Sequence, residues 1–266
     1  MITFVTCWYK FNNKFNDITY SQWIENFLSN INNFYLVVYT NKLSYPFIEK
    51  YSNLKNIKIV IKEVEDFYNY KYKENWLVNH EKNYLLNTKI SWEVNMLWNE
   101  KISFVKDAYE NNYFETEWVG WCDIGYFRDR KNDLSRDQLK MWPNIEKINN
   151  LNKDKIYYAR VQNNRELFNE YVKTLLHKSP IGLPYKEIPH DQVSIAGGFF
   201  LIYRDNIDWY HRLNDSKIQL YFSNNRLIKD DQIIVLTNIV DNMSKFVLVA
   251  ENSHYDNWFL FQRYLI

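Results

Sequence analysis

A carboxylate, a glycine and a guanidinium group follow one another at the end of an apolar run in WVGWCDIGYFR, residues 118–128. The run ends in Asp123, Gly125 stands two residues later, and Arg128 closes the segment. Ligands of open α/β sheets bind beyond the carboxyl ends of strands, and carboxylate oxygens suit Mg²⁺ or Mn²⁺. The spacing therefore predicts a ligand or metal site at Asp123. The alternative is an aspartate that ends the strand in a turn, with Gly125 supplying a positive φ.

Two adjacent glycines, Gly197 and Gly198, stand inside the strand-like run 193–203. The whole chain has five glycines, so a pair within one run indicates a backbone requirement. Glycine inside a strand marks a bulge or a place where a ligand approaches the backbone. We expect these two residues to make room for a ligand, and a bulge without a ligand is the alternative.

Two aspartates and an amide, Asp230, Asp231 and Gln232, precede the apolar run IIVLTNIV. One carboxylate is expected to cap the helix predicted over residues 230–242, because aspartate is a favoured N-cap residue. The other carboxylate and the amide are then candidates to bind a hydroxyl group or to act as a base.

Two basic side chains complete the candidate set. Lys101 stands on the apolar stripe of a helix predicted over residues 91–110, so it either contacts a phosphate as a point charge or extends to solvent along a buried stem. His254 follows the last predicted strand in the loop ENSHYDNW. It either completes a metal site begun by Asp123 or is an ordinary surface residue.

Strand-like and helix-like segments alternate along the chain. We expect these elements to hold the candidate residues in place. Strands are predicted over residues 2–9, 34–40, 57–61, 117–124, 155–161, 193–203 and 245–250. Helices are predicted over residues 91–110, 164–177, 205–214 and 230–242, and after a capping box formed by Thr19 and Gln22. Several strands are apolar throughout, as strands covered on both faces are. We therefore predict one α/β domain over residues 1–266, with a mostly parallel, mixed sheet flanked by helices.

Three less apolar stretches connect these elements. Residues 62–90 and 129–154 are polar, and we interpret them as excursions from the same domain. The loop 177–192 holds three of the five prolines, so we expect it to be ordered and able to line a site.

Composition excludes several classes of protein. Thirty-three basic and 32 acidic residues leave a formal charge of +1, which argues against a nucleic-acid-binding protein or one that binds an anionic membrane. No run of apolar residues is long enough to span a bilayer, and the N-terminal residues show no secretory signal. Two cysteines exclude a disulfide framework. We expect a cytoplasmic protein.

Familiar nucleotide-binding and catalytic motifs are missing from the sequence. It contains no G-x-G-x-x-G after a strand, no G-x-x-x-x-G-K-[ST], no G-x-S-x-G and no C-x-x-C. An α/β enzyme without these motifs is best accounted for by metal-assisted use of a nucleotide ligand.

Three short motifs follow one another along the sequence. The first is L-W-N-E-K (97–101) leading to W-C-D-I-G-Y-F-R (121–128), the second is A-G-G-F-F (196–200), and the third is Asp231-Gln232 followed by W-F-L-F (258–261). This order resembles the GT-A glycosyltransferases and, more narrowly, the HtrL/YibB-like family. The resemblance extends over nearly the whole chain.

The resemblance implies transfer of a hexose from a nucleoside diphosphate sugar, most simply a UDP-sugar, to a hydroxyl of a glycan or another acceptor. It implies a donor-binding half over residues 1–128 and an acceptor half over residues 129–266. It also implies a divalent ion, Mn²⁺ or Mg²⁺, near the strand-end aspartate. Gly125 stands where the general D-x-D signature has its second aspartate, which shifts the metal ligands to Asp123 and the remote His254.

Roles for single residues follow from the same resemblance. Catalytic roles fall to Asp123, Asp230 and Asp231. Donor binding falls to Thr6, Lys101, Gly125, Arg128, Gly197, Gly198 and Gln232. Two rival interpretations remain: a sugar-binding protein of this fold without catalysis, and a nucleotidyltransferase, which would normally carry a glycine-rich phosphate loop where residues 6–15 have no glycine.

Overall fold

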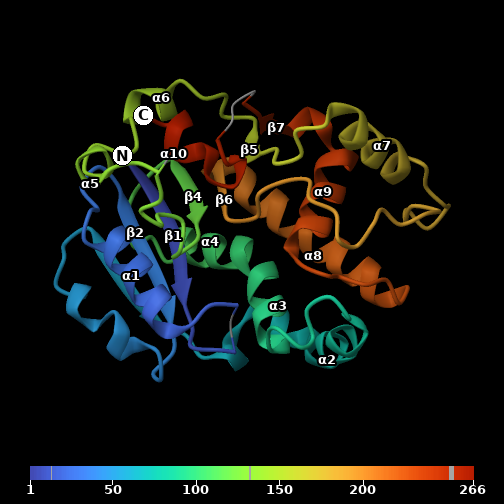
Figure 1. The fold of residues 1–266 in the computed structure, drawn as a ribbon, viewed down its shortest axis with the longest axis horizontal. Coiled ribbons are helices and arrows are strands. Elements are labelled where there is room, and N and C mark those ends of the chain that lie inside the picture. The colour runs from blue at the N-terminus through green and yellow to red at the C-terminus, as the bar shows by residue number, and fades with distance from the viewer. Residues whose placement is uncertain (13, 132, 252–254) are drawn as a thin grey trace.

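One mixed sheet runs through the whole chain. In the computed structural model, which describes residues 1–12, 14–131, 133–251 and 255–266, seven strands lie in the order β3-β2-β1-β4-β6-β5-β7 (Figure 1). Their bounds are β1 (Ile2–Trp8), β2 (Tyr35–Thr40), β3 (Ile57–Ile61), β4 (Trp118–Cys122), β5 (Ile156–Ala159), β6 (Phe199–Tyr203) and β7 (Phe246–Val249). Each predicted strand is present, and the predicted α/β class with a mostly parallel, mixed sheet is confirmed.

Strand β6 is the element that makes the sheet mixed. It pairs antiparallel with both β4 and β5, whereas the other neighbouring strands pair in parallel. The carboxyl ends of β1 and β4 and the amino end of β6 therefore meet at one edge of the sheet. This geometry brings residues that follow β4 close to residues that precede β6.

Helices cover both faces of the sheet because successive strand side chains point to opposite sides. The helices are α1 (Asp17–Leu28), α2 (Lys73–Lys82), α3 (Trp92–Asn99), α4 (Lys101–Glu110), α5 (Arg136–Leu139), α6 (Ile145–Asn149), α7 (Arg165–Leu176), α8 (Ile207–Ser223), α9 (Asp231–Asp241) and α10 (Leu260–Tyr264). In β1, Val5 and Cys7 join the core cluster that includes α4, α8 and α9, while Phe4 and Trp8 join the cluster that includes α1 and α10. No helix among the described residues is long and apolar enough to cross a bilayer.

The first helix begins earlier than the sequence predicts. Its N-cap is Asn16, whose side-chain oxygen accepts a hydrogen bond from the backbone N–H of Thr19 at 2.9 Å. The predicted capping box of Thr19 and Gln22 is therefore wrong, because both residues already lie inside the helix. Asparagine satisfies the same orphan N–H groups that a threonine cap would.

The helix predicted over residues 91–110 is divided into two. Helix α3 ends at Asn99 and α4 begins at Lys101, with Glu100 as the residue shared by both caps. The buried Glu100 carboxylate accepts hydrogen bonds from the backbone N–H groups of Tyr68 at 2.6 Å and Asn69 at 2.9 Å. The polar stretch 62–90 is thereby attached to the helix junction, and Lys101 stands in the first turn of a helix.

The two glycines precede strand β6 and do not lie inside it. The strand begins at Phe199, and the backbone N–H of Asp123 donates to the carbonyl of Gly198 at 2.9 Å. The prediction of a strand over 193–203 is therefore too long at its amino end. The glycines form the approach to the strand at the edge where β4 ends.

Candidate active site

A cleft of about 1100 Å³, including the space open to solvent, lies at this edge of the sheet. It is lined by nine of the residues predicted to form a site: Lys101, Asp123, Gly125, Arg128, Gly197, Gly198, Asp230, Asp231 and Gln232. These residues are up to 131 positions apart in the sequence (232 − 101), so the fold, and not local sequence, brings them together.

Of the remaining predicted residues, Thr6 does not line the cleft. Thr6 is completely buried in β1, and its hydroxyl has no hydrogen-bond partner among the described residues. The neighbouring residues Cys7, Trp8 and Tyr9 line the inner recess of the cleft, and Thr6 does not. His254 lies outside the described residues.

Lys101 lines the cleft and is buried. Its ammonium group donates to the carbonyl of Gly197 at 2.8 Å and to Oδ2 of Asp231 at 2.8 Å, and it lies 3.3 Å from Oδ1 of Asp123. An ammonium group has three N–H donors, and here each has an oxygen within reach. Lys101 thus joins the end of β4, the approach to β6 and the start of α9.

Burial and the opposite charges of the cluster act against each other on the pKa values of Lys101 and Asp231. Burial alone would lower the pKa of Lys101, but the carboxylates of Asp123 and Asp231 outweigh it and raise that pKa. Burial raises the pKa of Asp231, and Lys101 opposes that shift. A single cation between two carboxylates leaves the cluster with one net negative charge.

The two carboxylates differ in how far they reach into the cleft. The side chain of Asp231 is 10% exposed and that of Asp123 is 43% exposed. Oδ1 of Asp123 also accepts a hydrogen bond from the indole Nε1 of Trp121 at 2.5 Å. Asp123 is therefore fixed through one oxygen and presents the rest of its carboxylate to the cleft.

Both glycines are required by the closeness of these carboxylates. A β-carbon at Gly198 would lie 3.0 Å from Oδ2 of Asp123, and one at Gly197 would lie 2.8 Å from Cγ of Asp231. The groups that need the space beside these glycines are side chains of the protein itself, whereas the prediction was that a ligand would need it.

Asp230 caps helix α9, as expected of one member of the acidic pair. Its carboxylate accepts from the backbone N–H of Gln232 at 3.1 Å and lies 2.9 Å from the ammonium of Lys229. The side-chain amide of Gln232 donates to the same carboxylate at 3.3 Å. Asp230 is thus held by structural contacts, which leaves Asp231 as the carboxylate directed to the cluster.

Arg128 forms one wall of the cleft. Its guanidinium carbon lies 4.1 Å from the centre of the Trp23 ring and 4.9 Å from that of Phe259, and its Nε donates to the carbonyl of Gly125 at 2.9 Å. Its terminal nitrogens make no hydrogen bond or ion pair with the described residues. A β-carbon at Gly125 would lie 2.6 Å from Trp23, so this glycine lets the loop pack against the ring on which Arg128 stacks.

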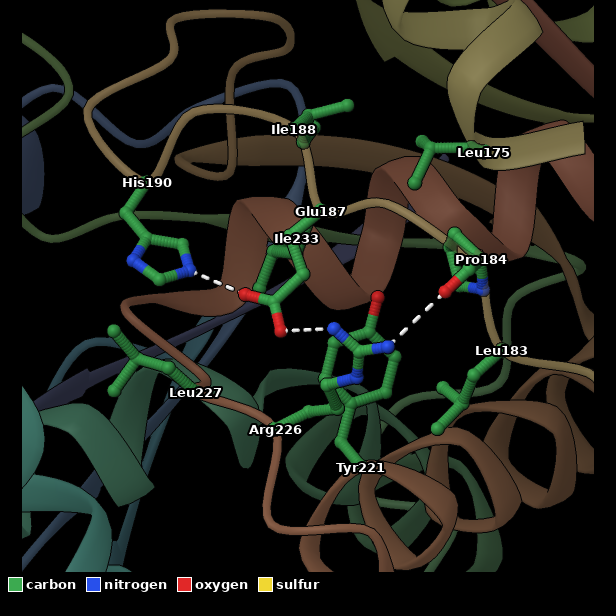
Figure 2. Close-up of a pocket in the computed structure, with 10 residues that line it drawn as sticks. All are labelled: Leu175, Leu183, Pro184, Glu187, Ile188, His190, Tyr221, Arg226, Leu227 and Ile233. Carbon is green, nitrogen blue, oxygen red and sulfur yellow. Dashed lines mark hydrogen bonds and ion pairs between the residues drawn. The ribbon is translucent and has the colours of Figure 1, made fainter. Parts of the chain in front are cut away.

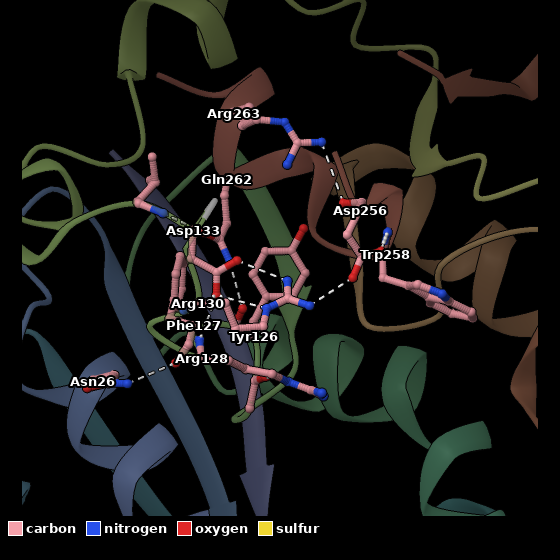
Figure 3. A network of polar contacts seen from close by, with 12 residues as sticks. Asn26, Tyr126, Phe127, Arg128, Arg130, Asp133, Asp256, Trp258, Gln262 and Arg263 are labelled. Atoms are coloured by element: carbon pink, nitrogen blue, oxygen red, sulfur yellow. Dashed lines mark hydrogen bonds and ion pairs between the residues drawn. The ribbon is translucent and has the colours of Figure 1, made fainter. Parts of the chain in front are cut away.

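A polar network holds the loop that carries Arg128. Arg130 binds Asp133 at 2.9 Å and Asp256 at 2.8 Å, and Gln262 donates to the carbonyl of Tyr126 at 2.8 Å (Figure 3). The network joins the segment after β4 to the segment that leads into α10. Arg130 is therefore paired, in contrast to the terminal nitrogens of Arg128.

Sequence reasoning missed the residues that form the remaining walls. Lys14 lines the cleft with its ammonium 4.5 Å from the ring centre of Trp98, and burial lowers its pKa. Phe15, Tyr20, Trp98, Trp258 and Phe259 add aromatic surface. The only available signal was their aromatic or basic type within segments already singled out, since no spacing connects residues 14, 98 and 258.

The expected divalent ion can be tested against the groups that are present. Among the described residues, no group of three histidine, cysteine, aspartate or glutamate side chains is placed to hold a metal ion. Asp123 and Asp231 converge, but the ammonium of Lys101 lies between them. The described residues thus do not by themselves form a metal site, and the predicted ligand His254 lies outside them.

A second cavity, of about 310 Å³ including the space open to solvent, is lined by the proline-rich loop 177–192 and by helices α7, α8 and α9 (Figure 2). Glu187 pairs with His190 at 2.6 Å and with Arg226, whose guanidinium also donates to the carbonyl of Pro184 at 3.1 Å. The proline-rich loop therefore lines a cavity, in which Glu187 and Arg226 pair with each other.

Comparisons with known proteins find similar solved structures but no related sequence. No family model and no curated protein matches the sequence. Similar solved structures include the galactosyltransferase LgtC in complex with donor and acceptor sugar analogues, which is 12% identical with a TM-score of 0.46 over 88% of this chain and 69% of that one.

Two further solved structures have similar sequence identities and TM-scores. A glycosyltransferase involved in glycosylating the major capsid of PBCV-1 is 10% identical, with a TM-score of 0.41 over 94% of this chain and 81% of that one. A 4-diphosphocytidyl-2C-methyl-D-erythritol synthase from Anaerococcus prevotii DSM 20548 is 10% identical, with a TM-score of 0.40 over 99% and 97%. Identities and TM-scores this low assign no function to the protein.

Proposed function

We propose that the protein is a glycosyltransferase of the GT-A type, related to the HtrL/YibB-like family, that transfers a hexose from a UDP-sugar to an acceptor hydroxyl. The observation that carries the proposal is the cleft itself: Asp123, Lys101 and Asp231 meet in it, and Arg128 lines it with terminal nitrogens that have no partner among the described residues. A cleft with carboxylates, an unpaired guanidinium and aromatic walls suits a ligand with hydroxyl, phosphate and ring portions.

The basic side chains of the cleft differ in how many of their N–H groups are free to bind a diphosphate. Lys101 is committed to Asp231, Asp123 and Gly197, and Arg130 is committed to Asp133 and Asp256. Arg128 and Lys14 have no carboxylate partner among the described residues. Arg128 is therefore the first candidate for the diphosphate, because a guanidinium presents parallel N–H donors to phosphate oxygens.

Transfer then needs little beyond positioning and charge. The bond between the sugar C1 and the β-phosphate oxygen breaks, the nucleoside diphosphate leaves with the electron pair, and the acceptor oxygen bonds to C1. The acceptor proton passes to a base, a role that Asp231 would serve or that it would support by orienting hydroxyls. Arg128 offsets charge developing on the leaving diphosphate.

Asp123 and the glycine pair would hold the sugar. Asp123 is the more exposed carboxylate, and charged oxygens accept strong hydrogen bonds from sugar hydroxyls. Gly198 lies next to it. The divalent ion predicted at Asp123 and His254 stays a prediction, and none of these steps depends on it.

A thermal-shift screen with nucleoside diphosphates and their sugars tests the proposal. A ligand present at 100 times its dissociation constant should stabilise the protein by about 2.7 kcal/mol. Stabilisation by a nucleotide sugar, followed by donor turnover, would support it. Binding without turnover would favour the sugar-binding interpretation, and the absence of any nucleotide effect would refute the proposal.

A further inference from the structure

The oxygen atoms around the Lys101 ammonium resemble the ligands of a bound metal ion. Two carboxylate oxygens and one backbone carbonyl lie within 3.3 Å of the ammonium nitrogen. They come from the end of β4, the approach to β6 and the first turn of α9, so the cation joins three elements. The lysine is buried and its side chain is 9% exposed.

The same oxygens are not available to a metal ion while Lys101 is in place. A divalent ion between Asp123 and Asp231 would need oxygen contacts near 2.0–2.2 Å, in roughly the position of the ammonium. An ion bound to Asp123 alone would face a positive charge 3.3 Å from one of its ligand oxygens. Two cations that share one carboxylate repel each other, which opposes binding of the ion.

We propose that Lys101 is the resident cation of this cluster, that it positions Asp123 and Asp231 as a metal ion would, and that donor binding needs no divalent metal. Lys101 is a positioning residue, because its three N–H groups are used within the protein. Asp123 and Arg128 then make the contacts with substrate. The statement about donor binding rests on the proposed function. The statement about the cation of the cluster does not, and it can be tested without a donor.

Titration of Mn²⁺ alone, followed by electron paramagnetic resonance, tests the cluster directly. We compare the wild-type protein with Lys101→Met and with Lys14→Met, which removes a positive charge from the same cleft but leaves the cluster intact. Lys101→Met should bind Mn²⁺ at least about tenfold more tightly than either of the others. Addition of Asp123→Asn to Lys101→Met should abolish the gain.

Two results would overturn the proposal. One is saturable Mn²⁺ binding by the wild-type protein that Asp123→Asn removes. The other is a folded Lys101→Met variant that binds Mn²⁺ no better than Lys14→Met. The first result would return the metal to Asp123, as the sequence predicts, and the second would show that Lys101 does not take the place of a metal ion.

A second measurement covers the case in which Lys101→Met does not fold. The stabilisation of the wild-type protein by UDP should be the same in EDTA as in Mn²⁺, and a requirement for Mn²⁺ would contradict the proposal. If UDP does not bind under either condition, the proposed function fails, while the wild-type Mn²⁺ titration still decides the question of the cation. These two failures are therefore distinguishable.

Chemical rescue separates a positioning role from a purely structural one. Lys101→Ala removes the ammonium and most of its stem, which leaves space for a small alkylammonium ion. Propylammonium should restore donor turnover in this variant more than it does in Asp123→Asn, because only the first retains both carboxylates. Equal responses of the two variants would argue that Lys101 serves only as packing.

Discussion

The carboxylate of Asp231 packs directly against the backbone of Gly197. A β-carbon at Gly197 would come within 2.8 Å of both Cγ and Oδ1 of Asp231, while the carbonyl of the same glycine accepts a hydrogen bond from Lys101 at 2.8 Å. Gly197 is therefore required by the cluster, since any side chain would displace the carboxylate that Lys101 holds.

Gly197→Ala should lower both stability and donor turnover, although it adds only one methyl group. Asp231 cannot withdraw without breaking its 2.8 Å contact with Lys101, so the added methyl group should cost about 1–3 kcal/mol of the free energy of unfolding. Donor turnover should fall at least about tenfold, which corresponds to about 1.4 kcal/mol. Urea denaturation and a turnover assay measure both effects.

Gly198→Ala is the matched control for this change. Its β-carbon would meet Oδ2 of Asp123 at 3.0 Å, and Asp123 is the more exposed of the two carboxylates. The loss of stability should be smaller than for Gly197→Ala. A larger loss at Gly198 would contradict this account of the cluster.

Arg128→Ala should weaken binding of nucleoside diphosphates while leaving the fold intact. The guanidinium stacks on Trp23 and its terminal nitrogens are unpaired among the described residues, so its loss removes a phosphate contact without leaving a buried charge unpaired. The dissociation constant for UDP should rise at least about tenfold, equal to about 1.4 kcal/mol. Isothermal titration calorimetry at two salt concentrations measures it.

Arg130→Ala provides the comparison. Arg130 binds Asp133 and Asp256, so its replacement should lower the unfolding temperature more than Arg128→Ala does and should weaken UDP binding less. The reverse pattern would exchange the roles proposed for the two arginines.

Asp123→Asn should reduce transfer by orders of magnitude with little loss of stability. Asparagine keeps an oxygen that can accept from the indole of Trp121, but it removes the charge that faces Lys101 at 3.3 Å. That charge belongs to the carboxylate that we propose binds sugar hydroxyls. Each tenfold decrease corresponds to about 1.4 kcal/mol of transition-state stabilisation. If the variant turns over donor at the wild-type rate, Asp123 is only a turn residue.

Glu100→Gln should change how stability depends on pH. Burial raises the pKa of Glu100 from 4.5 to about 7, so between these values the native state binds more protons than the unfolded state does. The contribution of Glu100 to stability is therefore greatest below pH 4.5 and is lost as the pH rises through 7, by about 3 kcal/mol in total. Glutamine does not titrate.

The measurement is the free energy of unfolding of both proteins at pH 5 and at pH 8. Relative to the wild-type protein, Glu100→Gln should be more stable at pH 8 than at pH 5. A difference that does not change with pH would show that Glu100 has the same pKa in the folded and unfolded protein.

The sequence was sufficient to predict the strands and the edge at which the site forms. Apolar runs mark strands covered on both faces, and Asp123 ends such a run, so its place at a carboxyl edge follows from the pattern alone. Asp123 and Gly197 line the same cleft. They do so because β6 runs antiparallel to β4, which brings the amino end of one strand to the carboxyl end of the other.

The contacts inside the cleft could not be predicted in the same way. Periodicity placed Lys101 on a partly buried stripe, but not between two carboxylates, because that arrangement depends on Gly197 and Asp231 far along the chain. Glu100 interrupts a pattern that is helical throughout, because its partners are backbone N–H groups near residue 68. Arg128 stacks on Trp23, and no spacing connects those two residues.

The contacts of Lys101 also determine when during folding the cleft can exist. Its hydrogen bonds to Gly197 and Asp231 join residues 96 and 130 positions apart, and contacts of such long range form only after large loops have closed. A chain emerging from the ribosome can complete β1, β2 and α4 before residue 231 is synthesised, but it has no cluster at that stage. The candidate site is therefore a product of the last part of folding, and donor binding would report that the N- and C-terminal parts of the sheet have joined.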